Sequence, residues 1–221
     1  MKKSFNTAFF APLFVAIGMS AIIAAGRTFL RPYLHFEHWG VFPIEQMSDI
    51  FWVVLFGVIF YYRKIFPCKA DMICTAFLSF IMFMRELGVH HMMTKTDSTP
   101  FKIHFFTNPN NPLHEKIISA TIIVLILAAA LYLLGKYFVK MVKGFFKLSP
   151  LCWTMATFGC WGIVCKAADR IPSLYAKRTG VSFAQDTIDF YSLVEEAGEM
   201  FLPLLIMLAI WQLAQAQAKK S

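Results

Sequence analysis

Two pairs of ionisable residues have a spacing that would bring their side chains together on a helix. Glu86 and His90 are four residues apart, and so are Glu195 and Glu199. Residues four apart project from one face of an α-helix. A carboxylate and an imidazole on facing helices could share protons as general acid and base, or bind a divalent transition metal. We predict catalytic roles for these four residues and leave the metal open, because helical metal sites usually repeat a Glu-x-x-His pair on two helices.

Further charged residues lie close to these pairs in the sequence. Arg85 and Arg170 are candidates for holding an anionic substrate group, because a guanidinium binds carboxylate or phosphate through paired hydrogen bonds. Asp169 and Glu196 complete the set of predicted substrate-binding residues. The same charges, together with Lys166, could instead pair with one another in an ion network that only fixes helix packing. Both interpretations stay open at this stage.

Composition identifies the elements that must position these residues. The chain has 221 residues, is 58% hydrophobic and has a mean hydropathy of +0.59. Only helices and closed barrels satisfy the backbone inside a bilayer, and repeated apolar runs of near-span length indicate helices. We predict an all-α polytopic bundle that forms a single membrane domain over residues 1–221, with Ser48 capping its second helix. The six predicted spans cover about residues 8–26, 48–62, 72–88, 117–135, 150–167 and 188–214.

Charge predicts the orientation of these spans. Six spans place both ends of the chain on one side, and the ends and connections on that side hold eleven of the 21 Lys and Arg residues with one acidic residue, Asp71. The other side holds twelve of the 13 acidic residues and all six histidines. Its connections are about twice as long, so its basic residues are less concentrated near the span ends. The positive-inside rule therefore predicts cytoplasmic termini, and we expect a bacterial inner (plasma) membrane location.

Four of the predicted spans have apolar runs that are too short to cross the hydrocarbon. A span needs about 20 apolar residues. Lys and Arg at the inner ends can extend to the membrane surface, whereas the outer ends carry carboxylates, arginines and a histidine. Intramembrane charges face one another or water, so we predict a polar chamber in the outer leaflet. The short runs are Ile50–Tyr62, Met72–Met84, Leu151–Cys165 and Met200–Trp211.

Three functions fit such a chamber, so whether the protein is an enzyme stays open. The first is a membrane-embedded hydrolase or transferase that acts on a lipid or lipid-linked substrate from the outer leaflet. The second is a small ion- or proton-coupled transporter, against which we count the absence of Gly/Pro-interrupted midplanes in the predicted spans. The third is a non-catalytic assembly or accessory subunit whose ion network is structural.

Membrane lipids are the expected partners, and the chain could form a homo-oligomer or join a larger membrane complex. The net charge of +8 requires no nucleic acid, because the basic residues flank the spans. Lys136, Lys140, Lys143 and Lys147 recur at spacings of four, three and four. These lysines could contact anionic lipid, although ordinary extension of lysine side chains to the membrane edge explains them at least as well.

Overall fold

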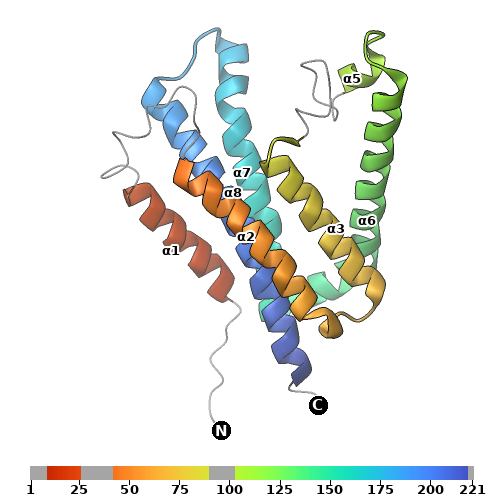
Figure 1. Cartoon of the computed structure of the whole chain (residues 1–221). Helices are drawn as coiled ribbons and strands as arrows, with labels where there is room; N and C mark the ends of the chain where they lie inside the picture. The colour runs from red at the N-terminus through yellow and green to blue at the C-terminus, as the bar shows by residue number, and fades with distance from the viewer. Residues whose placement is uncertain (1–8, 26–41, 90–102, 219–221) are drawn as a thin grey trace. The chain divides into compact units, whose positions relative to one another are not determined.

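The protein is built from α-helices. The structure, a computed structural model, describes residues 9–25, 42–89 and 103–218 (Figure 1). It is 89% helical, and the described residues form no strand. The predicted all-α fold class is therefore confirmed.

Six long helices and two short ones make up the described chain. Each of the six predicted apolar segments falls on one of the long helices, which are α1 (Phe10–Ala25), α2 (Phe42–Tyr61), α3 (Lys69–Glu86), α6 (Leu113–Phe146), α7 (Pro150–Thr179) and α8 (Gln185–Ala218). The short elements are the 3₁₀ turn η4 (Arg63–Ile65) and α5 (Ile103–Thr107).

Three of these helices are long and apolar enough to cross a membrane. They are α6, α7 and α8, while α1 and the Gln46–Tyr61 part of α2 are shorter apolar helices. The chain therefore has the helices of a membrane protein, as its composition predicts. By this criterion the six spans and the cytoplasmic termini are not confirmed.

Two helix ends differ from the sequence prediction. α2 begins at Phe42, so Ser48 lies inside the helix and the prediction that it caps this helix is wrong. Pro43 falls in the first turn of α2, a position that favours proline. α7 continues well beyond its apolar run and ends at Gly180, whose φ of 73° is the left-handed conformation common after a helix.

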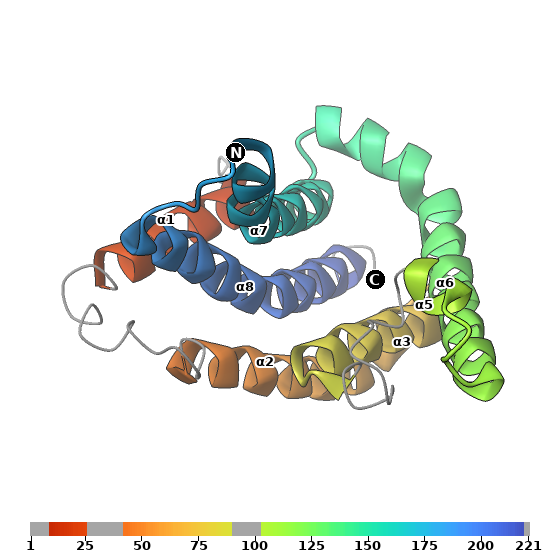
Figure 2. The ribbon, with the colours of Figure 1, turned by 90° about the horizontal axis from the view of Figure 1, so that it is seen from above.

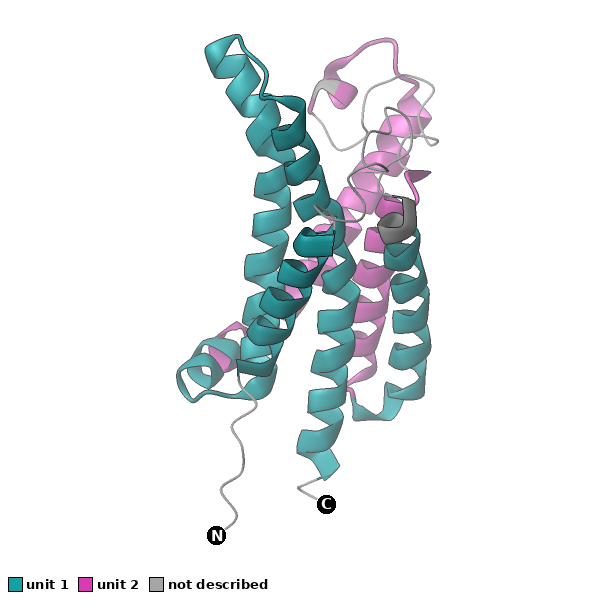
Figure 3. Cartoon of the chain, turned by 90° about the vertical axis from the view of Figure 1, so that its left-hand side faces the viewer, with its two compact units in different colours: residues 1–65, 141–221 teal, residues 66–140 magenta. Residues whose placement is uncertain are grey.

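The chain divides into two compact units, each of which is described by itself. Unit 1 contains residues 1–65 and 141–221, and unit 2 contains residues 66–140 (Figure 3). The single membrane domain remains a prediction. In unit 1, α8 is the central helix, because α1, α2 and α7 all pack on it (Figure 2).

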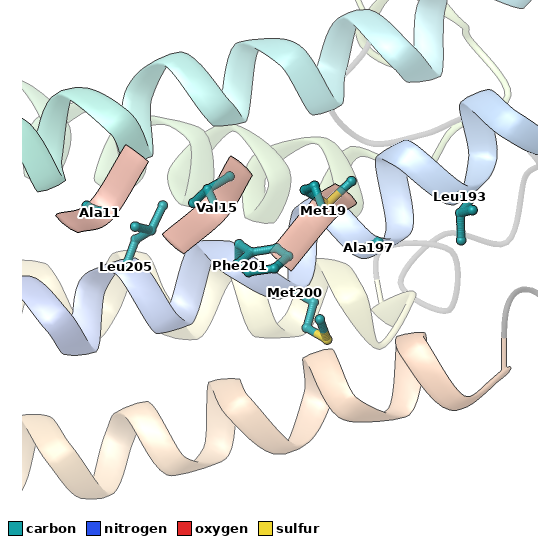
Figure 4. Packing of buried hydrophobic residues seen from close by; sticks show 8 residues of the cluster. All are labelled: Ala11, Val15, Met19, Leu193, Ala197, Met200, Phe201 and Leu205. Carbon is teal, nitrogen blue, oxygen red and sulfur yellow. The ribbon is translucent and has the colours of Figure 1, made fainter. Parts of the chain in front are cut away.

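The core of unit 1 lies between α1 and α8. Residues at a spacing of four on α1 meet apolar residues of α8 in one cluster: Ala11, Val15, Met19, Leu193, Ala197, Met200, Phe201 and Leu205 (Figure 4). Gly18 allows this close approach, since a Cβ atom there would lie 2.5 Å from the ring of Phe201. On another face of α8, the indole Nε1 of Trp161 in α7 donates to the carbonyl of Gly198 at 3.1 Å.

In unit 2, hydrogen bonds link α5 and the loop after it to the residues at the start of α6. The Asn111 side chain donates to the carbonyl of Phe105 at 2.7 Å, and Lys116 donates to the carbonyl of Asn108 at 2.7 Å. Asn111 and Phe105 are both buried. These bonds fix the chain that leads into α6.

Candidate functional site

α8 places the predicted catalytic residue Glu199 in the interior of unit 1, where its side chain is 7% exposed. Successive helical residues are rotated by about 100°, so Glu199 lies on a different face from Gly198 and from Phe201. Gly198 approaches α7, and Phe201 packs against α1. α2 is the third helix that packs on α8, and Met200, the residue after Glu199, points toward it (Figure 4).

α2 carries a stripe of buried side chains whose first members are polar. Ser48, Trp52, Leu55 and Ile59 are at most 2% exposed, and their spacing places them on one face. Ser48 Oγ, Trp52 Nε1 and Asp49 Oδ1 have no hydrogen-bond partner in the described structure. Buried polar atoms are normally bonded, and an unmade bond costs about 1–3 kcal/mol. Three such atoms within five residues therefore mark a candidate site.

The register of α2 against α8 brings these atoms to the level of Glu199. The two helices run in the same direction side by side (Figures 1 and 2). The Gln217 side chain donates to the carbonyl of Ile65 at 2.5 Å and ties the far ends together. Ser48 lies 17 residues before Ile65, and Met200 lies 17 residues before Gln217. In two helices that run side by side, equal distances from this bond place Ser48 at about the level of Met200 and its neighbour Glu199. We call Ser48, Asp49, Trp52 and Glu199 the α2–α8 polar group.

The backbone of α8 is interrupted at the same level. Pro203 lies inside the helix. Because proline has no N–H, it cannot donate the usual helical bond to the carbonyl four residues earlier, which belongs to Glu199. The prediction that the spans have no Gly/Pro interruption is therefore wrong for α8. This interruption adds backbone polarity where the buried carboxylate already lies.

The α2–α8 polar group has the donors and acceptors of a binding site. Trp52 supplies an N–H donor, Ser48 supplies a hydroxyl that donates or accepts, and the two carboxyl groups accept when ionised and donate when protonated. A polar ligand could bond to the three α2 atoms whose hydrogen bonds are unmade, and the buried carboxyl group of Glu199 could exchange a proton with it. This is the chemistry of general acid and base catalysis.

Replacing Ser48 by alanine tests whether its hydroxyl has an unmade bond. We expect the melting temperature in detergent to stay equal or rise, with a gain of up to about 1 kcal/mol, because no bond is lost. Thr154→Val is the matched control, since Thr154 Oγ1 is also buried but donates to Gln212 Oε1 at 2.9 Å. That variant should lose about 1–3 kcal/mol. Equal losses in both would show that Ser48 is bonded in the native protein.

Two other predicted residues lie near Glu199 on α8. Glu195 is one turn before it on the same face, as the spacing predicts, and Glu196 lies between the two. Both side chains are half-buried. α8 therefore carries three carboxyl groups within five residues.

Asp169 and Arg170 lie on α7 in an ion cluster of their own helix. The Asp169 carboxylate pairs with Lys166 in the preceding turn and with Arg170, whose Nε is 3.5 Å away. The Arg170 and Lys166 side chains are 58% and 53% exposed. These ion pairs are of the kind that the ion-network interpretation expects for Lys166, Asp169 and Arg170. The role of Asp169 and Arg170 in substrate binding remains a prediction.

The remaining predicted residues belong to unit 2. Arg85 and Glu86 form the last turn of α3, where both side chains are half-buried, and His90 lies outside the described residues. Glu86 and the three glutamates of α8 are thus in different units. Their convergence in one chamber stays a prediction.

A metal centre is not visible in the described part of the chain. No group of three or more His, Cys, Asp and Glu side chains is placed there to hold a metal ion. The divalent metal remains an expectation attached to the pair of Glu86 and His90, of which only Glu86 is described.

A second polar cluster, which sequence reasoning missed, joins α3 to α6 in unit 2. Asp71 is 2% exposed and accepts hydrogen bonds from Lys136 at 2.7 and 2.9 Å, from Tyr132 at 3.0 Å and from Tyr137 at 2.5 Å. Cys68 Sγ also contacts Lys136 Nζ, at 3.1 Å. The sequence does contain a signal for this cluster. Asp71 is an isolated carboxylate at the start of one helix, and a later helix carries the Tyr-x₃-Lys-Tyr pattern of Tyr132, Lys136 and Tyr137.

The electrostatics of this cluster favour ionised Asp71. Burial raises the pKa of Asp71. Hydrogen bonds from the side chains of Lys136, Tyr137, Cys68 and Tyr132 lower this pKa by a larger amount, so it falls to about 2. Asp71 lies in the first turn of α3, before the predicted span over residues 72–88. At neutral pH the ionised Asp71 carboxylate therefore joins α3 to α6 through its ion pair with Lys136.

The described helices and their buried polar groups define a helical membrane protein. Comparison with protein families, with curated proteins and with solved structures finds no match to this chain. Function must therefore be argued from the chemistry of its own residues.

Proposed function

We propose that this protein is a membrane-embedded hydrolase or transferase that acts on a lipid or lipid-linked substrate at the α2–α8 polar group. The observation that supports the proposal is the buried carboxyl group of Glu199 at the level of three buried polar atoms whose hydrogen bonds are unmade. A polar headgroup would satisfy those atoms on binding. Glu199 would then act as the general acid or base.

The other predicted residues take secondary places in this proposal. Glu195 shares the face of Glu199 and would tune or share its proton, since neighbouring carboxylates raise one another's proton affinity. Glu86 and His90 would complete the acid and base set or hold a divalent metal, and Arg85 would hold an anionic group of the substrate. The topology that goes with this function has six spans, cytoplasmic termini and an outer-leaflet site in a bacterial inner membrane.

The position of Glu199 along α8 supports an intramembrane site. It lies 14 residues from the start of the helix, Gln185, which is about 21 Å at the helical rise. A substrate that reaches this level from the lipid side must itself be soluble in the bilayer. Lipids and lipid-linked molecules meet that requirement, because their headgroups can enter between helices while their chains remain in hydrocarbon.

Changing Glu199 to glutamine tests the proposed function. Purified protein is reconstituted in vesicles of a bacterial polar lipid extract, and lipid products are measured by mass spectrometry over time. The variant should lose product formation by at least about 100-fold, the scale of general acid or base catalysis, while its melting temperature stays equal or rises. Asp186→Asn is the control, because it removes an exposed carboxylate near the start of α8, about 20 Å from Glu199 by helical rise. Identical products from wild type and Glu199→Gln would contradict the enzyme.

A second candidate function, an assembly or accessory subunit, has its own supporting observation. Lys166, Asp169 and Arg170 are partly exposed on α7, at a level about 24 Å or more from its start at Pro150 by helical rise. Charges at membrane depth seldom face lipid. A second membrane subunit, or a second copy of this chain, would cover them.

A further inference from the structure

α6 is much longer than a membrane span. Its 34 residues extend about 51 Å, whereas the hydrocarbon core is about 30 Å thick. The uncharged run from Ile117 to Gly135 already covers about 28 Å. The rest of the helix, from Lys136 to Phe146, is therefore not needed to cross the hydrocarbon core.

The lysines of this last part of α6 gather on one face. At about 100° per residue, Lys136, Lys140 and Lys143 fall within about 60° of one another, and Lys147 follows directly after the end of the helix. Four large apolar residues are exposed on the rest of its surface: Phe138 and Val142 lie opposite the lysines, and Val139 and Phe146 lie about 70–90° from them. A lysine face next to exposed aromatic and aliphatic side chains is typical of a helix that lies in the membrane interface.

The charge on the lysine face is not balanced by nearby acidic residues in the sequence. Lys136 is neutralised by Asp71, at 2.7 Å. Lys140 lies over the ring of Tyr137, with its Nζ 5.7 Å from the ring centroid. Lys143 and Lys147 are exposed, and the chain has no acidic residue between Glu115 and Asp169. A ligand of Lys143 and Lys147 would therefore supply negative charge.

We propose that the segment Lys136–Lys147 lies in the membrane interface and binds anionic phospholipid headgroups through Lys143 and Lys147. The bilayer meets both requirements of the segment at once: its acyl chains cover Phe138 and Phe146, and its headgroups neutralise the lysines. An acidic soluble protein would leave the apolar face uncovered, and nucleic acid would do the same. The proposal is independent of the activity proposed at Glu199.

The first experiment compares two charge-matched double variants in nanodiscs of phosphatidylcholine with one fifth phosphatidylglycerol. Native mass spectrometry counts the phosphatidylglycerol that stays bound after the lipid is exchanged for detergent. Lys143→Gln with Lys147→Gln should weaken retention about 25-fold, since each lysine near the surface contributes about fivefold. The control is Lys177→Gln with Arg178→Gln, two exposed basic residues at the end of α7, which should leave retention unchanged.

Two further variants separate headgroup binding from a folding defect. Lys143→Arg with Lys147→Arg keeps the charge and should keep the retention of phosphatidylglycerol. A photoreactive benzoylphenylalanine at position 146 should form lipid adducts, because Phe146 is proposed to lie against acyl chains. Unchanged retention in the Lys143→Gln and Lys147→Gln variant, an equal loss in the α7 control, or no lipid adduct at position 146 would each overturn the proposal.

Discussion

Replacing Asp71 by alanine is expected to lower the free energy of unfolding by about 3 kcal/mol, because hydrogen bonds to a charged group are worth about 1.5–3 kcal/mol each and are not additive. The substitution removes the acceptor that Lys136, Tyr132 and Tyr137 share. Unfolding of the purified protein in mixed micelles, followed by circular dichroism, measures the loss. Asp186→Ala is the control, since Asp186 is exposed near the start of α8 and should contribute less than about 1 kcal/mol.

The pH dependence of the same variant identifies the charged form as the stabilising one. The pKa of Asp71 in the folded protein is about 2, below the ordinary value of about 3.9. A lowered folded-state pKa gives stability that is present above the unfolded pKa and lost as the pH falls through the folded pKa. The gap between wild type and Asp71→Ala should therefore narrow from about pH 4 to about pH 2. A constant gap over that range would show that the ionised carboxylate is not responsible.

Replacing Gly198 by alanine is expected to cost about 1–3 kcal/mol, because the added methyl group overpacks the contact between α7 and α8. A Cβ atom at Gly198 would lie 2.5 Å from Cys165 Sγ and 3.2 Å from Trp161 Nε1. Cys165→Ala in the same chain removes the sulfur and should restore part of the lost stability. Thermal melting in detergent measures all three variants.

A second glycine gives the opposite expectation. Gly162 also lies within α7, but a Cβ atom there would meet nothing within 4 Å. Alanine is the better helix former by about 0.8–1 kcal/mol, so Gly162→Ala should keep or raise the melting temperature. If Gly198→Ala behaved like Gly162→Ala, the close approach of α7 to α8 at Gly198 would be refuted.

Hydropathy alone located the six long helices, because apolar runs of this length have few alternatives to helix. It did not give their ends. The apolar run of α7 stops at Cys165, yet the helix continues to Thr179 because Lys, Arg, Ala and Leu in this stretch are good helix formers. Ser48 was assigned as a cap on residue type, whereas the proline in the first turn marked the real start of α2.

The candidate site could be predicted only in part, for a physical reason. Helical spacing predicted correctly that Glu195 and Glu199 share a face, since that relation is local to one helix. The level of Glu199 relative to α2 and the partners of Asp71 on α6 are set by packing between distant segments, which spacing does not encode. The clustering of Ser48, Asp49 and Trp52 became visible only when the buried face of α2 was known.

The central position of α8 has a consequence for biogenesis. α1, α2 and α7 all pack on this helix, and all three are synthesised before it. Until α8 is synthesised, the apolar face of α1 and the polar atoms of α2 lack the helix that packs on them in the finished unit. The earlier helices of unit 1 therefore form an incompletely packed intermediate in which Asp49 and Ser48 are less buried. The core of unit 1 can close only once α8 has been made.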